Sequence, residues 1–199
     1  MEPLGQTKLT FQEYRSFPEG ERWELLDGRP YAMSGASVAH QEICRNLSVA
    51  LVDRFRGHAC QVFFAPLDVR LSEYDVVQPD LMVVCDRSQL KGNYVDGPPH
   101  LVVEIVSPSS LRHDRLRKFR LYASAGVKEY WILYPDAPLA EVYWLDDKGY
   151  RAHGVYSEAE TLQSPSFPHL ALPLGDIFPP VEIDEVKEGA LPYLSRPIG

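Results

Sequence analysis

The chain has 199 residues, of which 45% are hydrophobic and 24% charged, and these values indicate a globular protein of one domain. Its formal net charge of −8 argues against a general nucleic-acid coat protein, because such proteins gain affinity by neutralising phosphates, so any nucleic-acid contact should be local. No apolar stretch is long enough for a membrane span or a signal-peptide core, and we therefore expect a cytoplasmic protein.

The first predicted elements follow a short polar arm, residues 1–8. Residues 9–14 are predicted to form a brief helix with Thr10 as its N-cap. Residues 22–26 and 29–33 are predicted as two strands, and the Asp27-Gly28 pair between them is typical of a hairpin turn.

A long helix is predicted from Val38 to about Arg56, because apolar residues recur at helical spacing and Gly57 follows as a stop signal. Residues 61–71 and 78–85 are predicted as strands. The second is nearly continuous in apolar residues after Pro79-Asp80, as expected where both faces of a sheet are covered.

The same buried-strand pattern returns in residues 100–106, and the segment 107–110 (Ser-Pro-Ser-Ser) ends it and offers a hydroxyl cap. A second long helix is predicted over 111–125, ended by Gly126, and the strand 129–134 follows at once. This crossover requires the strands 100–106 and 129–134 to run parallel.

Residues 140–145 and 150–156 are predicted as an antiparallel hairpin. Together, the elements indicate an α/β or α+β three-layer domain, with a central mixed sheet flanked by helices, over residues 9–180. A poorly defined tail, residues 181–199, follows it.

The three cysteines, Cys44, Cys60 and Cys85, are widely spaced, with no Cys-x-x-Cys pair and no close histidine partner. This pattern fits neither a disulfide framework nor a zinc knuckle. We expect three buried thiols.

Two carboxylates stand out. Glu104 interrupts a strand that is otherwise suited to burial on both faces, and a buried ionised carboxylate without a partner is costly, so a cation should lie nearby. A structural ion pair, or a place at the exposed end of the strand, is the alternative. Asp80 heads another apolar strand 24 residues earlier; alone it is a turn signal, but with Glu104 on a neighbouring strand it would converge on one hard cation such as Mg²⁺.

Basic residues gather on the helix that follows Glu104. Residues 111–120 contain five basic residues against one acidic, and we identify Arg112 and Arg115 as candidate phosphate contacts. Lys118 also forms an i, i+4 pair with Asp114. An exposed salt bridge and a solvated charged face are the alternatives for this helix.

Several sequence motifs resemble those of the Uma-two family of restriction-endonuclease-like proteins. They are the Pro-Asp…Glu-x-x pattern, Val-Glu-Ile-Val-Ser-Pro-Ser-Ser, Tyr-Ala-Ser-Ala-Gly-Val-Lys-Glu-Tyr-Trp-Ile-Leu-Tyr-Pro, Glu24-Leu25-Leu26-Asp27-Gly28 and His40, over roughly residues 9 to 180. The resemblance implies the restriction-endonuclease-like fold and a PD-(D/E)XK-type site, in which Asp80, Glu104 and the main-chain carbonyl of Ile105 bind Mg²⁺ or Mn²⁺.

The chain departs from the superfamily pattern at Val106, two residues after Glu104, where a lysine is usual. The resemblance implies that Lys118, on the following helix, supplies the lysine, and that Glu24 is an additional acidic residue, with Glu42 as its rival. His40 has two interpretations, a contact with the site or a role in capping and packing the helix start, of which the second is more common for a lone histidine, and we do not count it as a catalytic group.

The resemblance, together with these residues, implies a metal-dependent endonuclease that hydrolyses phosphodiester bonds of nucleic acid, with DNA favoured and a homodimer only weakly favoured. The metal would activate a water, Lys118 would position that water or stabilise developing charge, and the basic helix would bind phosphates without reading sequence. The alternatives are a non-catalytic interaction module on the same scaffold and a hydrolase of a small phosphodiester.

Overall fold

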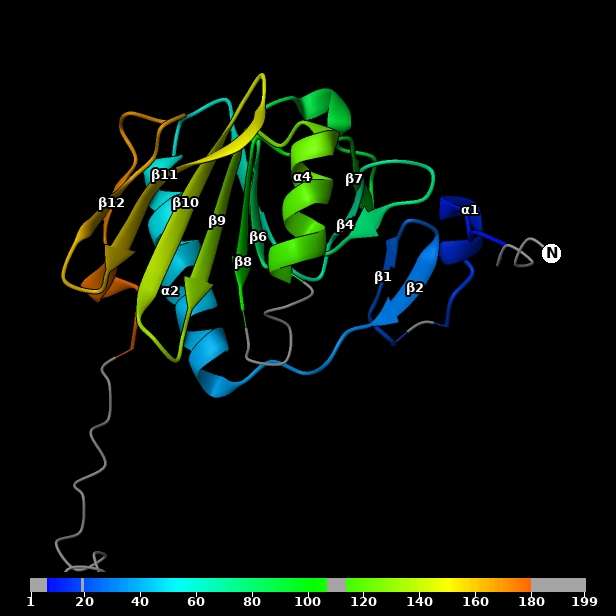
Figure 1. Ribbon diagram of the computed structural model, residues 1–199, viewed down its shortest axis with the longest axis horizontal. Helices are drawn as coiled ribbons and strands as arrows, with labels where there is room; N and C mark the ends of the chain where they lie inside the picture. The colour runs from blue at the N-terminus through cyan, green and yellow to red at the C-terminus, as the bar shows by residue number, and fades with distance from the viewer. Residues whose placement is uncertain (1–6, 19, 107–113, 180–199) are drawn as a thin grey trace, which may run out of the picture.

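A six-stranded mixed sheet forms the centre of the computed structural model, which describes residues 7–18, 20–106 and 114–179 (Figure 1). Its strands are β3 (Gln61–Phe64), β6 (Leu81–Val84), β8 (Leu101–Ile105), β9 (Glu129–Tyr134), β10 (Leu139–Asp146) and β11 (Gly149–Ser157). They lie in the order β11-β10-β9-β8-β6-β3. β8 and β9 pair in parallel, as the predicted crossover requires, and the other pairs are antiparallel.

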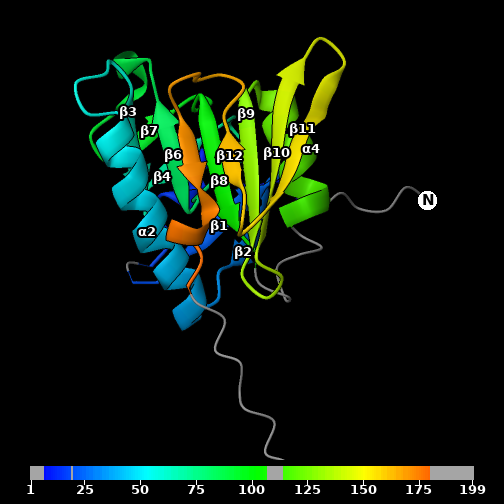
Figure 2. The same cartoon turned by 90° about the vertical axis from the view of Figure 1, so that its left-hand side faces the viewer.

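One face of this sheet is covered by the helix α2 (Val38–Arg54), as Figure 2 shows from its side. Ile43, Leu47 and Leu51 recur every four residues and bury against the sheet, which confirms the predicted helix. The hairpin of β12 (Thr161–Gln163) and β13 (Ala171–Pro173), followed by the short helix η3 (Leu174–Asp176), covers the rest of the same face.

The opposite face is covered by the helix α4 (Phe119–Ala125) and by a second sheet (Figure 1). The second sheet contains β1 (Trp23–Leu26), β2 (Arg29–Ala32), β4 (Asp68–Arg70), β5 (Val76–Val77) and β7 (Tyr94–Asp96), in the order β2-β1-β5-β4-β7. The helix α1 (Phe11–Tyr14) packs on its far side, where Thr10 forms the predicted N-cap. The mixed sheets and flanking helices confirm the predicted α+β fold class.

The predicted strand 61–71 is divided between the two sheets, and the predicted strand 78–85 is shortened to β6, so the boundaries of both were wrong. β3 ends at Phe64, and the chain passes through the cis Ala65–Pro66 peptide bond into β4 of the second sheet. It returns from β5 to β6 through residues 78–80. Pro66 has no N–H for a strand ladder, and an apolar run shows that a strand is buried but not which sheet holds it.

Cys60 and Cys85 form a disulfide bond, so the prediction of three buried thiols was wrong for these two residues. In the antiparallel pair of β3 and β6, Gln61 lies opposite Val84, and the same register brings Cys60 opposite Cys85. Cys44 remains a free, half-buried thiol. Sequence spacing alone could not reveal a pairing that depends on strand register.

The predicted helix 111–125 is divided into a π-helical turn, η2 (Asp114–Lys118), and α4, which ends at Gly126 as predicted. The short helix η1 (Arg87–Gln89) and the strand β7 were not predicted. Arg112, the predicted cap in residues 107–110, most of the arm and the tail lie outside the described residues. Within the described ranges, no helix has the length and apolarity that a membrane span requires.

Candidate active site

The pairing of β6 with β8 brings Asp80 and Glu104 to the same end of two adjacent strands. Leu81 lies opposite Val103, and the antiparallel register therefore places Asp80 opposite Glu104. Oδ2 of Asp80 accepts a hydrogen bond from the main-chain N–H of Ile105 at 2.8 Å, which fixes the Asp80 carboxylate beside β8. The three proposed metal-binding positions, Asp80, Glu104 and Ile105, are thus neighbours.

A buried lysine joins two buried carboxylates at this place. Nζ of Lys118 lies 3.0 Å from Oε1 of Glu104 and 2.8 Å from Oε1 of Glu24. The side chain of Lys118 is 3% exposed, and those of Glu24 and Glu104 are each 6% exposed. A solvent-exposed salt bridge is therefore excluded as the description of Lys118.

The residue two positions after Glu104 belongs to the hydrophobic core. Val106 is buried and packs in the same cluster as Tyr122, on the α4 face of the sheet. Because side chains alternate along a strand, Glu104 and Val106 point to the same face. Lys118 enters this face from η2, so the ammonium group reaches Glu104 from the helix rather than from the strand.

Two further polar partners escaped the sequence analysis. The hydroxyl of Tyr122 donates a hydrogen bond to Oε1 of Glu104 at 2.6 Å, and the main-chain N–H of Gln78 donates one to Oε1 of Glu24 at 3.0 Å. Burial raises the pKa of Tyr122 well above its ordinary value, so the hydroxyl keeps its proton. Tyr122 lies four residues after Lys118, a spacing that puts both on one helix face and that could have identified it.

His40 contacts the site, which is the first of its two interpretations. Ser37 caps α2, whereas Nε2 of His40 lies 3.2 Å from Oδ2 of Asp80. The hydrogen bond to Asp80 raises the pKa of His40, although burial and the positive charge of Arg22 oppose this shift. Within the described part of the chain, Nδ1 of His40 is buried without a hydrogen-bond partner.

A groove of about 1000 Å³ runs along α2 and reaches Asp80. His40 and Asp80 line it at the site, together with Arg22 from the start of β1 and Phe64 from the end of β3. Glu24 and Glu104 lie behind this surface, since both are buried. The site therefore combines an accessible part around Asp80 with a buried ionic part around Lys118.

The structure separates the other candidates. Glu24 bonds to Lys118, whereas its rival Glu42 is half-buried on α2, so the geometry favours Glu24. Arg112 lies outside the described residues, and the side chain of Arg115 is not described either. Arg117 of the same basic segment is exposed and stacks its guanidinium over the ring of Tyr31, 5.2 Å from the ring centroid.

The candidate ligand atoms are all oxygens, which are the ligands that a hard divalent cation prefers. Asp80 and Glu104 supply carboxylates and Ile105 a main-chain carbonyl, and Mg²⁺ commonly takes one or two protein carboxylates and completes its shell with water or phosphate. Within residues 7–18, 20–106 and 114–179, no group of three or more His, Cys, Asp or Glu residues is arranged to hold a metal.

A family model and relatives from Synechocystis match this chain. The model of the Uma2 family, described as "Putative restriction endonuclease", matches residues 10–175. A relative from Synechocystis, "Uncharacterized protein slr1290", is 32% identical over 146 residues, which cover 71% of this chain and 77% of the relative. A second Synechocystis relative, "Uncharacterized protein sll1609", is 25% identical over 130 residues, 63% of this chain and 73% of the relative.

A solved structure shares the fold. It is the crystal structure of "a putative nuclease belonging to DUF820" from Anabaena variabilis, which matches with a TM-score of 0.71 and 18% sequence identity. The match covers 85% of this chain and 97% of that protein. At this identity the likeness establishes the fold alone.

Proposed function

Because this chain belongs to the Uma2 family, described as "Putative restriction endonuclease", we propose that it is a metal-dependent endonuclease that hydrolyses phosphodiester bonds of nucleic acid, with DNA the favoured substrate. One observation carries the proposal. The buried ammonium of Lys118 is held between Glu24 and Glu104, the residue opposite Asp80 in the strand register, although the strand lacks the usual lysine at Val106.

Asp80, Glu104 and the carbonyl of Ile105 would hold the metal, Mg²⁺ or Mn²⁺. When bound, such an ion activates water and neutralises charge on the phosphate. Asp80 suits this role because its carboxylate is positioned by the Ile105 N–H and lines the groove through which a substrate would arrive. Glu104 suits it because Lys118 and Tyr122 hold the carboxylate in one orientation.

Lys118 would position the attacking water or stabilise the charge that develops on the phosphate. Its ammonium is fixed by two carboxylates rather than left mobile on a flexible side chain, which reduces the reorganisation needed during the reaction. Glu24 would act on Lys118, and through it on the site, since it bonds to the same ammonium group.

A test of this proposal compares the wild type with Asp80→Asn. The substituted amide keeps an oxygen that can accept the Ile105 N–H but lacks the charge a metal needs. Supercoiled and linear DNA, and RNA, are incubated with Mg²⁺, Mn²⁺ or chelator, and strand scission is followed on gels. We expect cleavage by the wild type with metal, none with chelator, and a loss of cleavage in Asp80→Asn.

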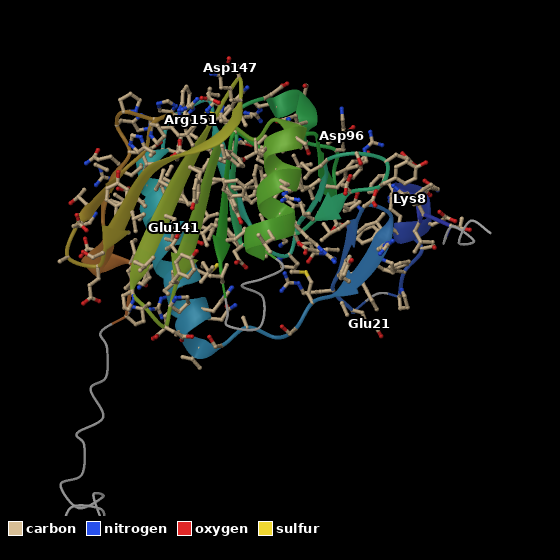
Figure 3. The ribbon with its side chains drawn as sticks, in the orientation of Figure 1. Lys8, Glu21, Asp96, Glu141, Asp147 and Arg151 are labelled. Carbon is tan, nitrogen blue, oxygen red and sulfur yellow. A yellow bond between two sulfur atoms is a disulfide. The ribbon has the colours of Figure 1, made fainter. Side chains whose placement is uncertain are left out.

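Asp96→Asn is the matched control, because Asp96 lies on β7 of the second sheet and pairs with Arg70 (Figure 3). It should cleave as the wild type does. If no nucleic acid is cut under any condition, or if Asp80→Asn cuts as well as the wild type, the proposal is wrong. Absence of cleavage together with metal-independent nucleic-acid binding would support a non-catalytic module instead.

A further inference from the structure

Two residues flank Asp80 in the groove along α2, and neither has a role in the site described above. We propose that Phe64 and Arg22 bind an unpaired nucleotide of a nucleic-acid strand, with the base stacked on Phe64 and its phosphate held by Arg22 beside Asp80. This inference rests on the proposed function, because it takes nucleic acid as the ligand. It adds that the groove prefers a single strand over a duplex.

Phe64 is placed next to Asp80 by the sheet register. It is the last residue of the edge strand β3 and lies opposite Leu81, which directly follows Asp80. The N–H of Ala65 donates to the carbonyl of Asp80 at 3.0 Å, which fixes the end of β3 at the site. The Phe64 ring is 55% exposed, and an exposed aromatic ring in a groove offers a stacking surface for any base.

Arg22 presents an unsatisfied donor in the same groove. Its Nε donates to Oε1 of Gln78 at 3.0 Å, and this bond orients the guanidinium plane. Within the described part of the chain, its Nη2 is buried and has no hydrogen-bond partner. A buried N–H group without an acceptor is unfavourable, and a phosphate oxygen is the acceptor that best matches an arginine.

The remaining lining of the groove fits an unpaired strand better than a duplex. Val49 and Val52 of α2 are 66% and 46% exposed, and Arg45, Arg54 and Arg56 line the same groove. A duplex presents phosphates and base edges but hides its base faces, so apolar side chains would gain little from it. A single strand exposes both base faces and phosphates, which match the apolar and guanidinium groups.

Fluorescence anisotropy with chelator present tests the inference without requiring cleavage. The probes are a short labelled oligonucleotide and the same sequence as a blunt duplex. We expect the wild type to bind the single strand more tightly. Phe64→Ala should weaken single-strand binding about 5- to 150-fold and leave duplex binding unchanged. Trp144→Ala, which removes another half-exposed ring on β10, is the control and should not change either affinity.

The salt dependence of binding tests Arg22 separately. For a single strand, Arg22→Met should reduce the slope of log K against log salt by about 0.7, the value for one lost phosphate contact. Arg22→Lys should keep the slope, because it keeps the charge although it loses the bond to Gln78. Arg87→Met removes an exposed arginine beyond the other end of β6 and should leave the slope unchanged.

The outcomes separate this inference from the nuclease proposal. Equal binding of strand and duplex, or equal effects of Phe64→Ala and Trp144→Ala, would overturn the groove assignment even if DNA is cleaved. An unchanged slope in Arg22→Met would overturn the phosphate contact. If Phe64→Ala weakens single-strand binding but no cleavage depends on Asp80, nucleotide binding in the groove is supported and the proposed nuclease activity is wrong.

Discussion

The ammonium nitrogen of Lys118 lies 3.0 Å from Oε1 of Glu104, although the two residues are separated by 14 positions in the chain. The same nitrogen bonds to Glu24, so one cation serves two carboxylates that come from different sheets. With Lys118 charged and both carboxylates ionised, this group carries one net negative charge before Asp80 is added. The formal charge of these three groups is compatible with the divalent cation proposed above.

Replacing Lys118 by methionine should destabilise the fold and abolish cleavage. The variant leaves Glu24 and Glu104 buried without their cation, and breaking a buried ion pair in this way costs about 3 to 5 kcal/mol. Urea denaturation gives the free energy of unfolding, and a plasmid-nicking assay gives the activity.

The double variant Lys118→Met/Glu24→Gln is the control for this prediction. It removes the charge of one of the two carboxylates that bond to the lost ammonium, so it should regain part of the lost stability and none of the activity. A single Lys118→Met variant as stable as the wild type would contradict the buried ionic arrangement.

Tyr122→Phe should lower the free energy of unfolding and slow cleavage without abolishing it. The change removes only the hydroxyl that donates to Glu104, and a hydrogen bond to a charged acceptor contributes about 1.5 to 3 kcal/mol. We expect this loss in the free energy of unfolding and a reduced rate of cleavage, because Glu104 keeps Lys118 but loses a second positioning contact.

Tyr150→Phe is the matched comparison, since the Tyr150 hydroxyl donates to the uncharged carbonyl of Val127 at 2.9 Å. It should cost less stability, about 0.5 to 1.5 kcal/mol, and should leave the cleavage rate unchanged. Equal effects of the two variants on cleavage would argue against a role for Tyr122 in the site.

Glu129 should contribute less to the free energy of unfolding as the pH rises. It is fully buried on β9 and accepts hydrogen bonds from the Trp131 indole, the Ser164 hydroxyl and the Ser166 N–H. Burial nevertheless raises its pKa above the ordinary value of 4.5. The folded chain then keeps a proton that the unfolded chain has released, so this contribution is full below about pH 4.5 and is lost as the pH rises through the raised pKa.

The measurement is the free energy of unfolding of the wild type minus that of Glu129→Gln, from below pH 4.5 to neutral pH. This difference should decrease with rising pH, because glutamine does not titrate. Exposed carboxylates with lowered pKa values, such as Glu13 and Asp146, are present in both proteins and cancel. A difference that stays constant or increases would show that the Glu129 pKa is not raised.

The cysteines should give one free thiol per chain. Thiol titration of the denatured protein without reductant should detect Cys44 alone, and titration after reduction should detect all three cysteines. In the folded protein Cys44 should react slowly, because burial raises the pKa of its thiol and lowers its thiolate fraction. Three thiols without reduction would contradict the bond between Cys60 and Cys85.

Features with local causes could be predicted from the sequence. The Thr10 cap and the turn at Asp27 and Gly28, both with positive φ, depend on residues close in the chain. The parallel pairing of β8 and β9 follows from the crossover connection between them, which contains α4. The need of Glu104 for a nearby cation follows from its burial, and Lys118 is that cation.

Features that depend on distant partners could not be predicted. The division of the predicted strand 61–71 between two sheets and the Cys60–Cys85 bond both depend on which strands are neighbours. The contact between His40 and Asp80 joins residues 40 positions apart, and a lone histidine carries no signal for its partner. The contact between Gln78 and Glu24 could not be predicted, because Gln78 donates through its main-chain N–H, which every residue except proline possesses.

Lys118 comes from the helical segment rather than from the strand, and this changes the pattern by which such sites should be sought in other sequences. A search for lysine two residues after the strand glutamate would reject this chain at Val106. Glu104, Lys118 and Tyr122 instead define the spacing Glu-x13-Lys-x3-Tyr, in which the last two residues share one helix face and both bond to the glutamate. Aligned sequences that change Lys118 and Tyr122 together with Glu104 would identify members in which this arrangement has been lost as a unit.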